Sequence, residues 1–271
     1  MRSANRMVGR VAHPLARVAT ALDHRGALTL LGWHRIDAGP GGLSTSFDDF
    51  RRHLDALEAW GARVLPLPVA VALLAEDALP ERAVALTFDD GYASVFERAW
   101  PELQRRGLPG TVFVVSSYLA GGRLPWDRHH CPHDDSVRIA SSRQVREAAD
   151  EGFDIGSHTA THPWLPGLAP EDVAVELKTS KADLEDLLQR EVSSFAYPMG
   201  GWNPEIHAAV GVAGYERAIT VDRGRNRPGH DPLALRRAFA FDDAADVIRQ
   251  LDGAYTWMRP IERRRDRRGP R

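Results

Sequence analysis

One stretch limits the folds open to this chain more than any other, the ten residues AVALTFDDGY from Ala83 to Tyr92. Its apolar, partly branched first half fits a buried strand, which stops at two adjacent carboxylates, Asp89 and Asp90, followed by Gly91. Proteins of the α/β class place their chemistry at the ends of strands. The stretch therefore predicts a buried strand that delivers two acids to a site.

The two acids have a plainer interpretation as well. Neighbouring residues of a strand point to opposite faces, so Asp89 and Asp90 can serve one site only if the strand ends there, and Gly91 permits the turn that this requires. The alternative is an Asx-type turn or a helix cap, in which the carboxylates bind only their own backbone. The pair alone does not decide between the two.

A second stretch, GSHTATHP from Gly156 to Pro163, repeats the plan with histidines after a short apolar run. His158 and His162 are four residues apart, but the proline that follows disfavours a helix, so we expect a loop or a single turn. Such a pair is more often structural than functional. Together with Asp90, however, it supplies two imidazoles and one carboxylate, the set that leaves a zinc position open for water.

Strand and helix patterns alternate along the chain. Strand patterns span residues 27–33, 62–67, 83–88, 111–115, 153–155, 194–197, 217–221 and 233–237. Helix patterns span residues 46–61, 69–75, 94–106, 141–152, 171–189, 203–210 and 244–251, with a kink or split expected at Trp100 because Pro101 follows it. About seven strand-helix units without a dividing linker predict a parallel sheet or barrel in one domain, residues 26–255.

The two ends of the chain are predicted to lie outside that domain. Residues 1–25 have apolar residues at helical spacing, but Pro14 and Arg17 interrupt them and no cleavage site follows, so we interpret them as an uncleaved extension. Residues 256–271 end in an arginine-rich run that is typical of a solvated, disordered tail. The longest apolar run, Val69 to Ala75, is far below the ~20 residues of a membrane span. We therefore expect a cytoplasmic protein without stable membrane insertion.

Composition excludes some classes of partner and site. The chain has 35 basic and 37 acidic residues, so no global field favours nucleic acid. Its single cysteine, Cys131, excludes an internal disulfide and any multi-cysteine zinc site. The longest stretch without a strand or helix pattern, residues 118–135, holds His129, His130 and His133 beside that cysteine. Their spacing fits no compact metal finger, and an ordinary loop is the favoured interpretation.

Two motifs give the chain a resemblance to a known family. Thr87 to Gly91 (TFDDG) and His158 to Pro163 (HTATHP) look like the first two signature motifs of the polysaccharide deacetylases, carbohydrate esterase family four. The resemblance covers roughly residues 27 to 250. It implies a distorted (β/α) barrel of about seven parallel strands, and it implies metal-assisted hydrolysis of an N-acetyl group on a sugar or glycan, with release of acetate.

The resemblance also implies a role for each motif residue. The family's first aspartate, a general base, falls on Asp89, and the family's metal triad falls on Asp90, His158 and His162. The implied cofactor is Zn²⁺ or another divalent ion such as Co²⁺, Mn²⁺ or Ni²⁺. Zinc lowers the pKa of its bound water to near 7, so a nearby carboxylate can take the proton while the metal stabilises the developing charge.

The third family motif departs from the pattern. It normally carries an arginine that orients the base, and a tyrosine after a proline whose backbone N–H helps to bind the oxyanion. In the matching stretch Phe195 to Gly200, Ala196 replaces the arginine and Met199 replaces the tyrosine. The backbone N–H survives at Met199, whereas the substitute for the arginine is not evident.

The general acid departs from the pattern as well. The family's late Leu-x-Ile-His motif has no match, because the corresponding residues 233–236 contain no histidine. A subgroup that includes the biofilm poly-N-acetylglucosamine deacetylases has this motif on the N-terminal strand, and Trp33-His34-Arg35-Ile36 is similar to it. The resemblance makes His34 the general acid, with His230 as second candidate. A histidine at a strand end is often merely structural.

Aromatic residues beside the motifs are candidates for sugar binding. Trp126, Trp164, Trp202 and Tyr197 could stack on a sugar ring, although wall packing is an equally good interpretation for each. The predicted partner is an N-acetylated sugar or glycan, and the sequence predicts no oligomeric state. Two alternatives stay open: an esterase that removes O-acetyl groups from a glycan, and a catalytically silent carbohydrate-binding relative, which the missing arginine motivates.

Overall fold

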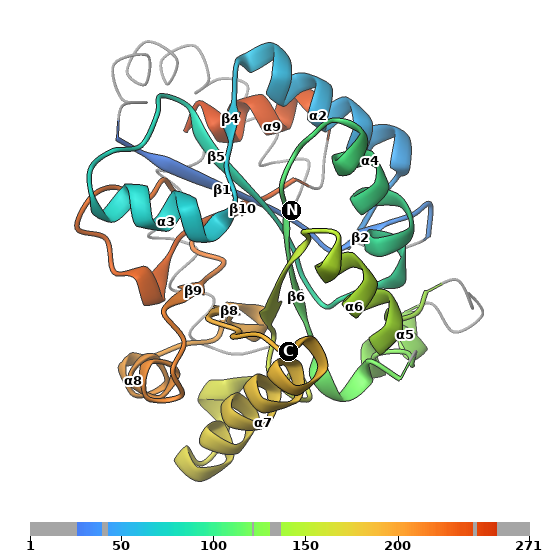
Figure 1. The fold of residues 1–271 in the computed structure, drawn as a ribbon, viewed down its shortest axis with the longest axis vertical. Helices are drawn as coiled ribbons and strands as arrows, with labels where there is room; N and C mark the ends of the chain where they lie inside the picture. The colour runs from blue at the N-terminus through green and yellow to red at the C-terminus, as the bar shows by residue number, and fades with distance from the viewer. Residues whose placement is uncertain (1–25, 40–42, 121, 131–136, 241–242, 254–271) are drawn as a thin grey trace.

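The structure is a computed structural model that describes residues 26–39, 43–120, 122–130, 137–240 and 243–253 (Figure 1). The main sheet contains β1 (Leu28–Trp33), β5 (Ala83–Phe88), β6 (Thr111–Val114), β7 (Asp154–Ser157), β8 (Ser194–Ala196), β9 (Arg217–Ile219) and β10 (Arg237–Phe239). These strands run parallel in the order β10-β1-β5-β6-β7-β8-β9, and β4 (Arg63–Val64) also pairs with β5, on the edge opposite β1. A small second sheet joins β2 (Arg35–Ile36) to β3 (Ser44–Thr45).

The gap between the first and last strands of this order is nearly closed. Leu235, just before β10, forms a parallel bridge with Ile219 of β9. Thr220 donates a backbone hydrogen bond of 2.8 Å to the Leu235 carbonyl, and the Leu235 N–H donates one of 2.9 Å to Ala218. The result is a nearly closed barrel of seven parallel strands in one α/β domain, which confirms the predicted fold class.

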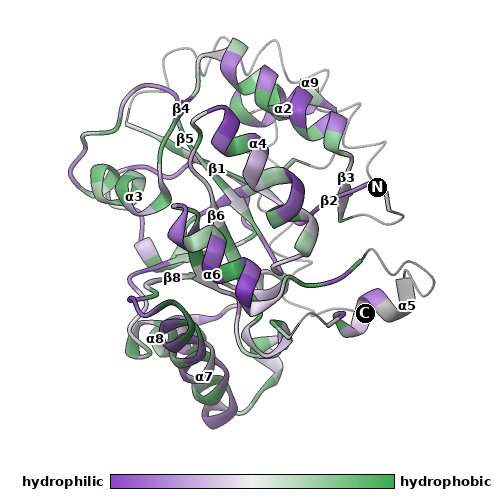
Figure 2. Ribbon diagram, turned by 45° about the vertical axis from the view of Figure 1, so that its right-hand side comes forward, coloured by the Kyte–Doolittle hydropathy of each residue, from purple (hydrophilic) through white to green (hydrophobic). Residues whose placement is uncertain are grey.

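Helices surround this barrel (Figure 1). They are α2 (Phe47–Trp60), α3 (Leu67–Ala75), α4 (Trp100–Arg105), α5 (Pro125–His130), α6 (Ser142–Asp150), α7 (Pro170–Leu188), α8 (Pro204–Val212) and α9 (Ala244–Leu251). Figure 2 shows polar and apolar residues alternating around α2 and α7, as expected for helices with one face on a sheet. Within the described residues, no helix combines the length and the apolar character that a bilayer crossing demands.

Helix boundaries follow the capping residues that the sequence contains. The Ser46 hydroxyl accepts a hydrogen bond from the Asp49 N–H at the start of α2, and Gly61 ends that helix with a left-handed φ of 79°. Ser141 and Gln144 form the reciprocal capping box of α6, and Asn203 caps α8 through the Ile206 N–H. These starts and stops were predictable because each depends on a few adjacent residues.

Three segments differ from the sequence-based expectation. The pattern at 94–106 is a π-helix, η1 (Val95–Ala99), that passes into α4 at the expected position. The irregular stretch 118–135 contains α5, and residues 131–136 lie outside the described residues. The strand expected over 233–237 is wrong in its first half, where a short 3₁₀ helix, η5 (Pro232–Ala234), precedes β10. Asp231 caps η5 by accepting from the Leu233 N–H.

The buried apolar residues form two clusters, one inside the barrel and one between the sheet and the surrounding helices, which we call the helical coat. Alternate residues of β1 and β5 join Phe113, Ala196 and Ile219 in one cluster, which is the barrel interior, and α3 packs on it. The intervening residues, such as Leu86 and Phe88, belong to the larger cluster between sheet and helices. The interior register of β5 continues to Asp89, whose N–H donates to the Trp33 carbonyl at 2.9 Å. The carboxyl ends of β1 and β5 are thereby held side by side.

The proposed extension, residues 1–25, and the tail, residues 256–271, lie outside the described residues. The domain boundaries therefore stay predictions.

Candidate metal centre and active site

A sharp backbone turn at the end of β5 brings the two aspartates to one site. Asp90 has a φ of 71° and Gly91 a φ of 78°, so two consecutive left-handed residues reverse the direction of the chain. A side chain at Gly91 would meet Val114, because its Cβ would lie 2.9 Å from Cγ1 of that residue. Asp89 and Asp90 are both almost completely buried. The turn, and not an Asx cap, explains the adjacent acids.

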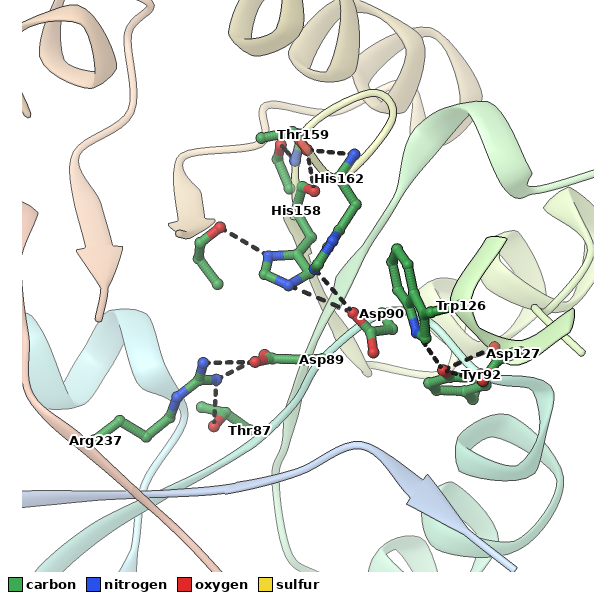
Figure 3. Close-up of polar contacts among 12 residues, drawn as sticks. Thr87, Asp89, Asp90, Tyr92, Trp126, Asp127, His158, Thr159, His162 and Arg237 are labelled. Atoms are coloured by element: carbon green, nitrogen blue, oxygen red, sulfur yellow. Dashed lines mark hydrogen bonds and ion pairs between the residues drawn. The ribbon is translucent and has the colours of Figure 1, made fainter. Parts of the chain in front are cut away.

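Asp90 meets the two motif histidines beyond the end of β7. Its Oδ1 lies 3.5 Å from Nε2 of His158 and 3.4 Å from Nε2 of His162 (Figure 3). One potential ligand atom from each of the three residues lies within 4.8 Å of the others. Ligands bound tetrahedrally to zinc at about 2.0–2.1 Å are roughly 3.3–3.4 Å from one another. The triad that the resemblance predicted is therefore spaced as a metal-ligand set.

The protonation states also favour ligands over ion pairs. Burial lowers the pKa of His158, and burial together with the charge of His158 holds the pKa of His162 well below its usual range. Burial and the neighbouring Asp89 raise the pKa of Asp90. Oδ1 of Asp90 is buried without a hydrogen-bond partner in the described part of the chain. Neutral imidazoles facing such an oxygen fit a divalent cation between them.

Hydrogen bonds fix the imidazole of His158 and the backbone of His162. Nδ1 of His158 lies 2.8 Å from the Ala196 carbonyl and donates to it, which leaves Nε2 free to bind a metal. The Thr159 hydroxyl donates to the His158 carbonyl at 2.5 Å and accepts from the His162 N–H at 2.9 Å. Thr159 and His162 have φ values of 67° and 63°, so Thr159 stabilises a strained loop.

Asp89 is bound by an arginine that the sequence analysis did not identify. Nη1 of Arg237 donates to Oδ1 of Asp89 at 2.7 Å, and Nη2 donates to Oδ2 at 2.6 Å (Figure 3). Nη1 also donates to the Thr87 hydroxyl at 3.2 Å, and Arg237 is 0% exposed. Burial raises the pKa of Asp89, but the charges of Arg237, His158 and His34 and the hydrogen bonds from Arg237 together outweigh it, so the net pKa is lowered.

Arg237 stands on β10, whereas the family's arginine would occupy the position of Ala196 on β8. One sequence signal could have found it. The predicted strand over residues 233–237 ends in an arginine, and a charged residue on a buried strand requires an opposite charge nearby. The signal does not say which carboxylate is the partner.

His34 follows β1 directly and lies near the same carboxylate. Its ring stacks on Phe239 with centroids 4.8 Å apart and an interplanar angle of 26°. Burial lowers the pKa of His34 to about 4, against an opposing effect of the Asp89 charge. The imidazole is therefore neutral at pH 7 in the resting site. His230, the second candidate, lies at the amino end of β10, where its Nδ1 accepts from the Arg227 N–H.

Trp126 of α5 forms a wall beside the triad. Its ring centroid lies 4.4 Å from that of His162, and its Nε1 donates to the Tyr92 hydroxyl at 3.3 Å (Figure 3). The Tyr92 hydroxyl in turn lies 2.9 Å and 3.1 Å from the two carboxylate oxygens of Asp127. A chain of hydrogen bonds therefore fixes α5 against the turn that carries Asp90.

The remaining sequence candidates surround the loop after β8. Trp164 packs on Gly201, where a Cβ would lie 2.5 Å from the indole ring, and Trp202 stacks on Tyr197 at 6.1 Å. Tyr197 itself is completely buried, and its hydroxyl donates to the Leu233 carbonyl at 2.8 Å. Its predicted contact with substrate is therefore wrong for this structure, because its side chain faces the helical coat.

Met199 has a left-handed φ of 53° and is 41% exposed on the same loop. It lies in the short helix η4 (Pro198–Gly200). The cluster around Cys131 and His133 lies outside the described residues, as do the side chains of His129 and His130.

Comparison with known proteins agrees with the fold and the motifs. YxkH of Bacillus subtilis is 29% identical over 211 residues, 78% of this chain and 70% of that protein. The poly-beta-1,6-N-acetyl-D-glucosamine N-deacetylase of Staphylococcus epidermidis is 23% identical over 220 residues, 78% of this chain and 73% of that protein.

Solved structures align along most of the chain. IcaB from Ammonifex degensii has a TM-score of 0.72 at 27% identity and covers 83% of this chain and 97% of its own. The Streptococcus pyogenes deacetylase PplD has a TM-score of 0.71 at 21% identity, with coverage of 83% and 98%. The family model "Polysaccharide deacetylase" matches residues 76–218, more than half of the chain. The protein belongs to the polysaccharide deacetylase family.

Proposed function

We propose that the protein is a divalent-metal-dependent hydrolase that removes N-acetyl groups from an N-acetylated sugar or glycan and releases acetate. The observation that carries the proposal is a carboxylate, Asp89, held ionised by Arg237 directly beside the triad of Asp90, His158 and His162. Membership of the polysaccharide deacetylase family supports it, as does similarity to the named Staphylococcus epidermidis N-deacetylase.

Asp90, His158 and His162 would hold the metal. Their two nitrogens and one oxygen suit Zn²⁺, and the same donors bind Co²⁺, Mn²⁺ or Ni²⁺. The bound ion would act as a Lewis acid and lower the pKa of a water molecule to near 7. The hydrogen bond from His158 to Ala196 aims the His158 imidazole at Asp90, and the Thr159 contacts fix the backbone that carries both histidines.

Asp89 is the proposed general base. Because Arg237 lowers its pKa, Asp89 is ionised through neutral pH and can accept a proton from the attacking water. The two parallel hydrogen bonds from Arg237 also fix the plane of the carboxylate. The loss of the arginine at position 196 was the reason to consider a catalytically silent relative, and Arg237 removes that reason.

His34 is the proposed proton donor to the leaving amine. The resting imidazole is neutral, since its pKa is about 4, so it must take up a proton, from solvent or the one that Asp89 accepts from the attacking water, before it can donate one to the amine. Negative charge that develops on the carbonyl oxygen would favour this uptake, because it stabilises a nearby imidazolium. The backbone N–H of Met199 is the proposed donor to that oxygen, a role that does not depend on the side chain.

The tryptophans are proposed to contribute differently to the sugar site. The Nε1 of Trp126 is already bound to Tyr92, so Trp126 would offer a ring and no further N–H donor. Trp164, on the loop after β7, and Trp202, on the loop after β8, are half-buried, and each could present part of its ring to a sugar. Acetate release from matched N-acetyl and O-acetyl substrates would separate the proposed amidase from an esterase.

Replacing Asp89 with Asn tests the base. The amide cannot accept the proton, so we expect acetate release to fall by about 100- to 10,000-fold while metal content stays at the parent level. Acetate release is measured on an N-acetylated sugar panel with and without a chelator, and metal content by elemental analysis. Deacetylation at the parent rate by the Asn variant would refute the proposed function.

Replacing Arg237 with Ala tests the role of the guanidinium. Without it, burial raises the pKa of Asp89, so the acidic limb of the pH profile of kcat/KM should move to higher pH. We expect kcat at neutral pH to fall roughly 10- to 100-fold, with partial recovery in Arg237→Lys. Arg138→Ala is the control, because Arg138 pairs with Glu97 at the surface. An unmoved acidic limb would contradict the assignment.

Replacing Thr159 with Ala tests the orientation of the metal ligands. The His162 N–H loses its acceptor, and we expect zinc affinity to fall by about 10- to 100-fold. Competition with a chromophoric chelator measures the affinity. Thr220→Ala is the matched control, because Thr220 is also buried but donates to the Leu235 carbonyl, away from the triad. Equal zinc affinities of the two variants would argue against the role of Thr159.

A further inference from the structure

We propose that Phe239 is a positioning residue that holds His34 and Arg237 in place together, and that Gly32 provides the space for its ring. The inference rests on the proposed function, in which His34 donates a proton and Arg237 orients the base Asp89. The side chain of Phe239 is apolar, so it would act by packing against His34 and Arg237 and not by hydrogen bonds.

The register of two neighbouring strands puts these residues in order along the barrel. β1 and β10 pair in parallel, with Leu30 opposite Arg237 and Gly32 opposite Phe239. His34 lies two residues beyond Gly32, on the same side of its strand. Arg237, Phe239 and His34 therefore follow one another from the barrel interior toward the carboxyl ends of the strands, with Phe239 in the middle.

Phe239 contacts both of its neighbours through its ring. The imidazole of His34 stacks on it with centroids 4.8 Å apart, and Cζ of Arg237 lies 4.5 Å from the ring centroid. A second ring, that of Phe113, lies 5.9 Å from the same guanidinium carbon. A guanidinium confined by two aromatic rings loses the freedom to adopt other rotamers. The ring of Phe239 is thus shared by the proposed acid and the partner of the proposed base.

Gly32 has a steric reason to be glycine. Its φ does not lie in the left-handed region, so its backbone conformation does not demand glycine. A Cβ at this position, however, would lie 2.8 Å from two ring carbons of Phe239 and 3.1 Å from Cδ of Arg237. Such contacts would force both side chains to move. The missing side chain of Gly32 is therefore what lets the ring and the arginine stem lie over β1.

The consequence for catalysis follows from geometry. Asp89 depends on Arg237 for its orientation, and His34 depends on the ring for its plane, so one displacement of Phe239 would disturb both proton-transfer groups. A misplacement of about 1 Å at a reacting group can cost on the order of 100-fold in rate. The metal triad shares none of these contacts, because its hydrogen bonds come from Ala196 and the loop of Thr159.

Phe239→Leu and Phe239→Tyr form the first test. Leucine keeps much of the apolar volume but removes the ring, and we expect kcat to fall about 10- to 100-fold with zinc content unchanged. Tyrosine keeps the ring and should retain kcat within about threefold. Phe96→Leu is the matched control, because Phe96 is a buried aromatic that packs on Phe153 in the helical coat. The inference is overturned if Phe239→Leu loses no more activity than Phe96→Leu.

A double-variant cycle separates positioning from general destabilisation. If Phe239 acts partly through His34, the loss caused by Phe239→Leu should be smaller in a His34→Asn background than in the parent, and the part that remains should reflect the contact of Phe239 with Arg237. An undiminished loss in that background would overturn the link to His34. Failure of the proposed function would show in the Asp89→Asn variant, whereas failure of this inference would leave that result unchanged.

Gly32→Ala provides a test that does not alter the aromatic residue. The added methyl should displace Phe239 and Arg237 and lower kcat by about 10-fold or more, with zinc content retained. Gly122→Ala is the control, since a Cβ there meets only Tyr118 at 4.0 Å. Thermal unfolding of each variant identifies any that fail to fold. A Gly32→Ala variant with the kcat of the parent would overturn the inference even if Phe239→Leu does not fold.

Discussion

The buried ion pair between Arg237 and Asp89 is the interaction on which the proposed site depends. Both side chains are almost completely excluded from water, and such burial costs several kcal/mol per ion unless the geometry of the pair is excellent. Two hydrogen bonds of 2.6 and 2.7 Å, with a third to Thr87, meet that condition. An apolar pair of the same volume would serve stability equally well. The charge is therefore explained by what it does to Asp89, whose carboxylate it keeps ionised.

Backbone strain concentrates around the same site. Seven non-glycine residues in the described ranges have a positive φ, and four of them are Asp90, Thr159, His162 and Met199. Each such conformation costs on the order of 1–3 kcal/mol, so the surrounding structure must support it. Thr159 does so with its hydroxyl, and the parallel barrel holds the ends of β5, β7 and β8 in fixed register. The strain is thus local to the loops, while the rigidity comes from the sheet.

How much could be predicted from the sequence depended on how local each signal was. The triad was identifiable because two short motifs carry it, and helix caps such as Ser46 and Ser141 were identifiable from adjacent residues. Arg237 was recognisable only as a charge on a predicted buried strand, without its partner, and Phe239 carried no signal, because the roles of both arise from a pairing of β1 with β10 across about two hundred residues. The sequence analysis placed Tyr197 beside the substrate. Side chains two residues apart on a strand face the same side, so Tyr197 points the same way as Phe195, into the cluster between sheet and helices.

A barrel explains how the arginine can stand on β10 when Ala196 occupies the family position on β8. Strands that are distant in the sheet order all point alternate side chains into one narrow interior, so a guanidinium can reach the same carboxylate from either side. Ala196 leaves interior space, and Gly32 leaves more on β1. The proposed reaction requires a positive charge beside the Asp89 carboxylate, whichever strand carries it. Supplying it from β10 places that charge next to His34 on β1, and this adjacency allows one ring, Phe239, to orient both.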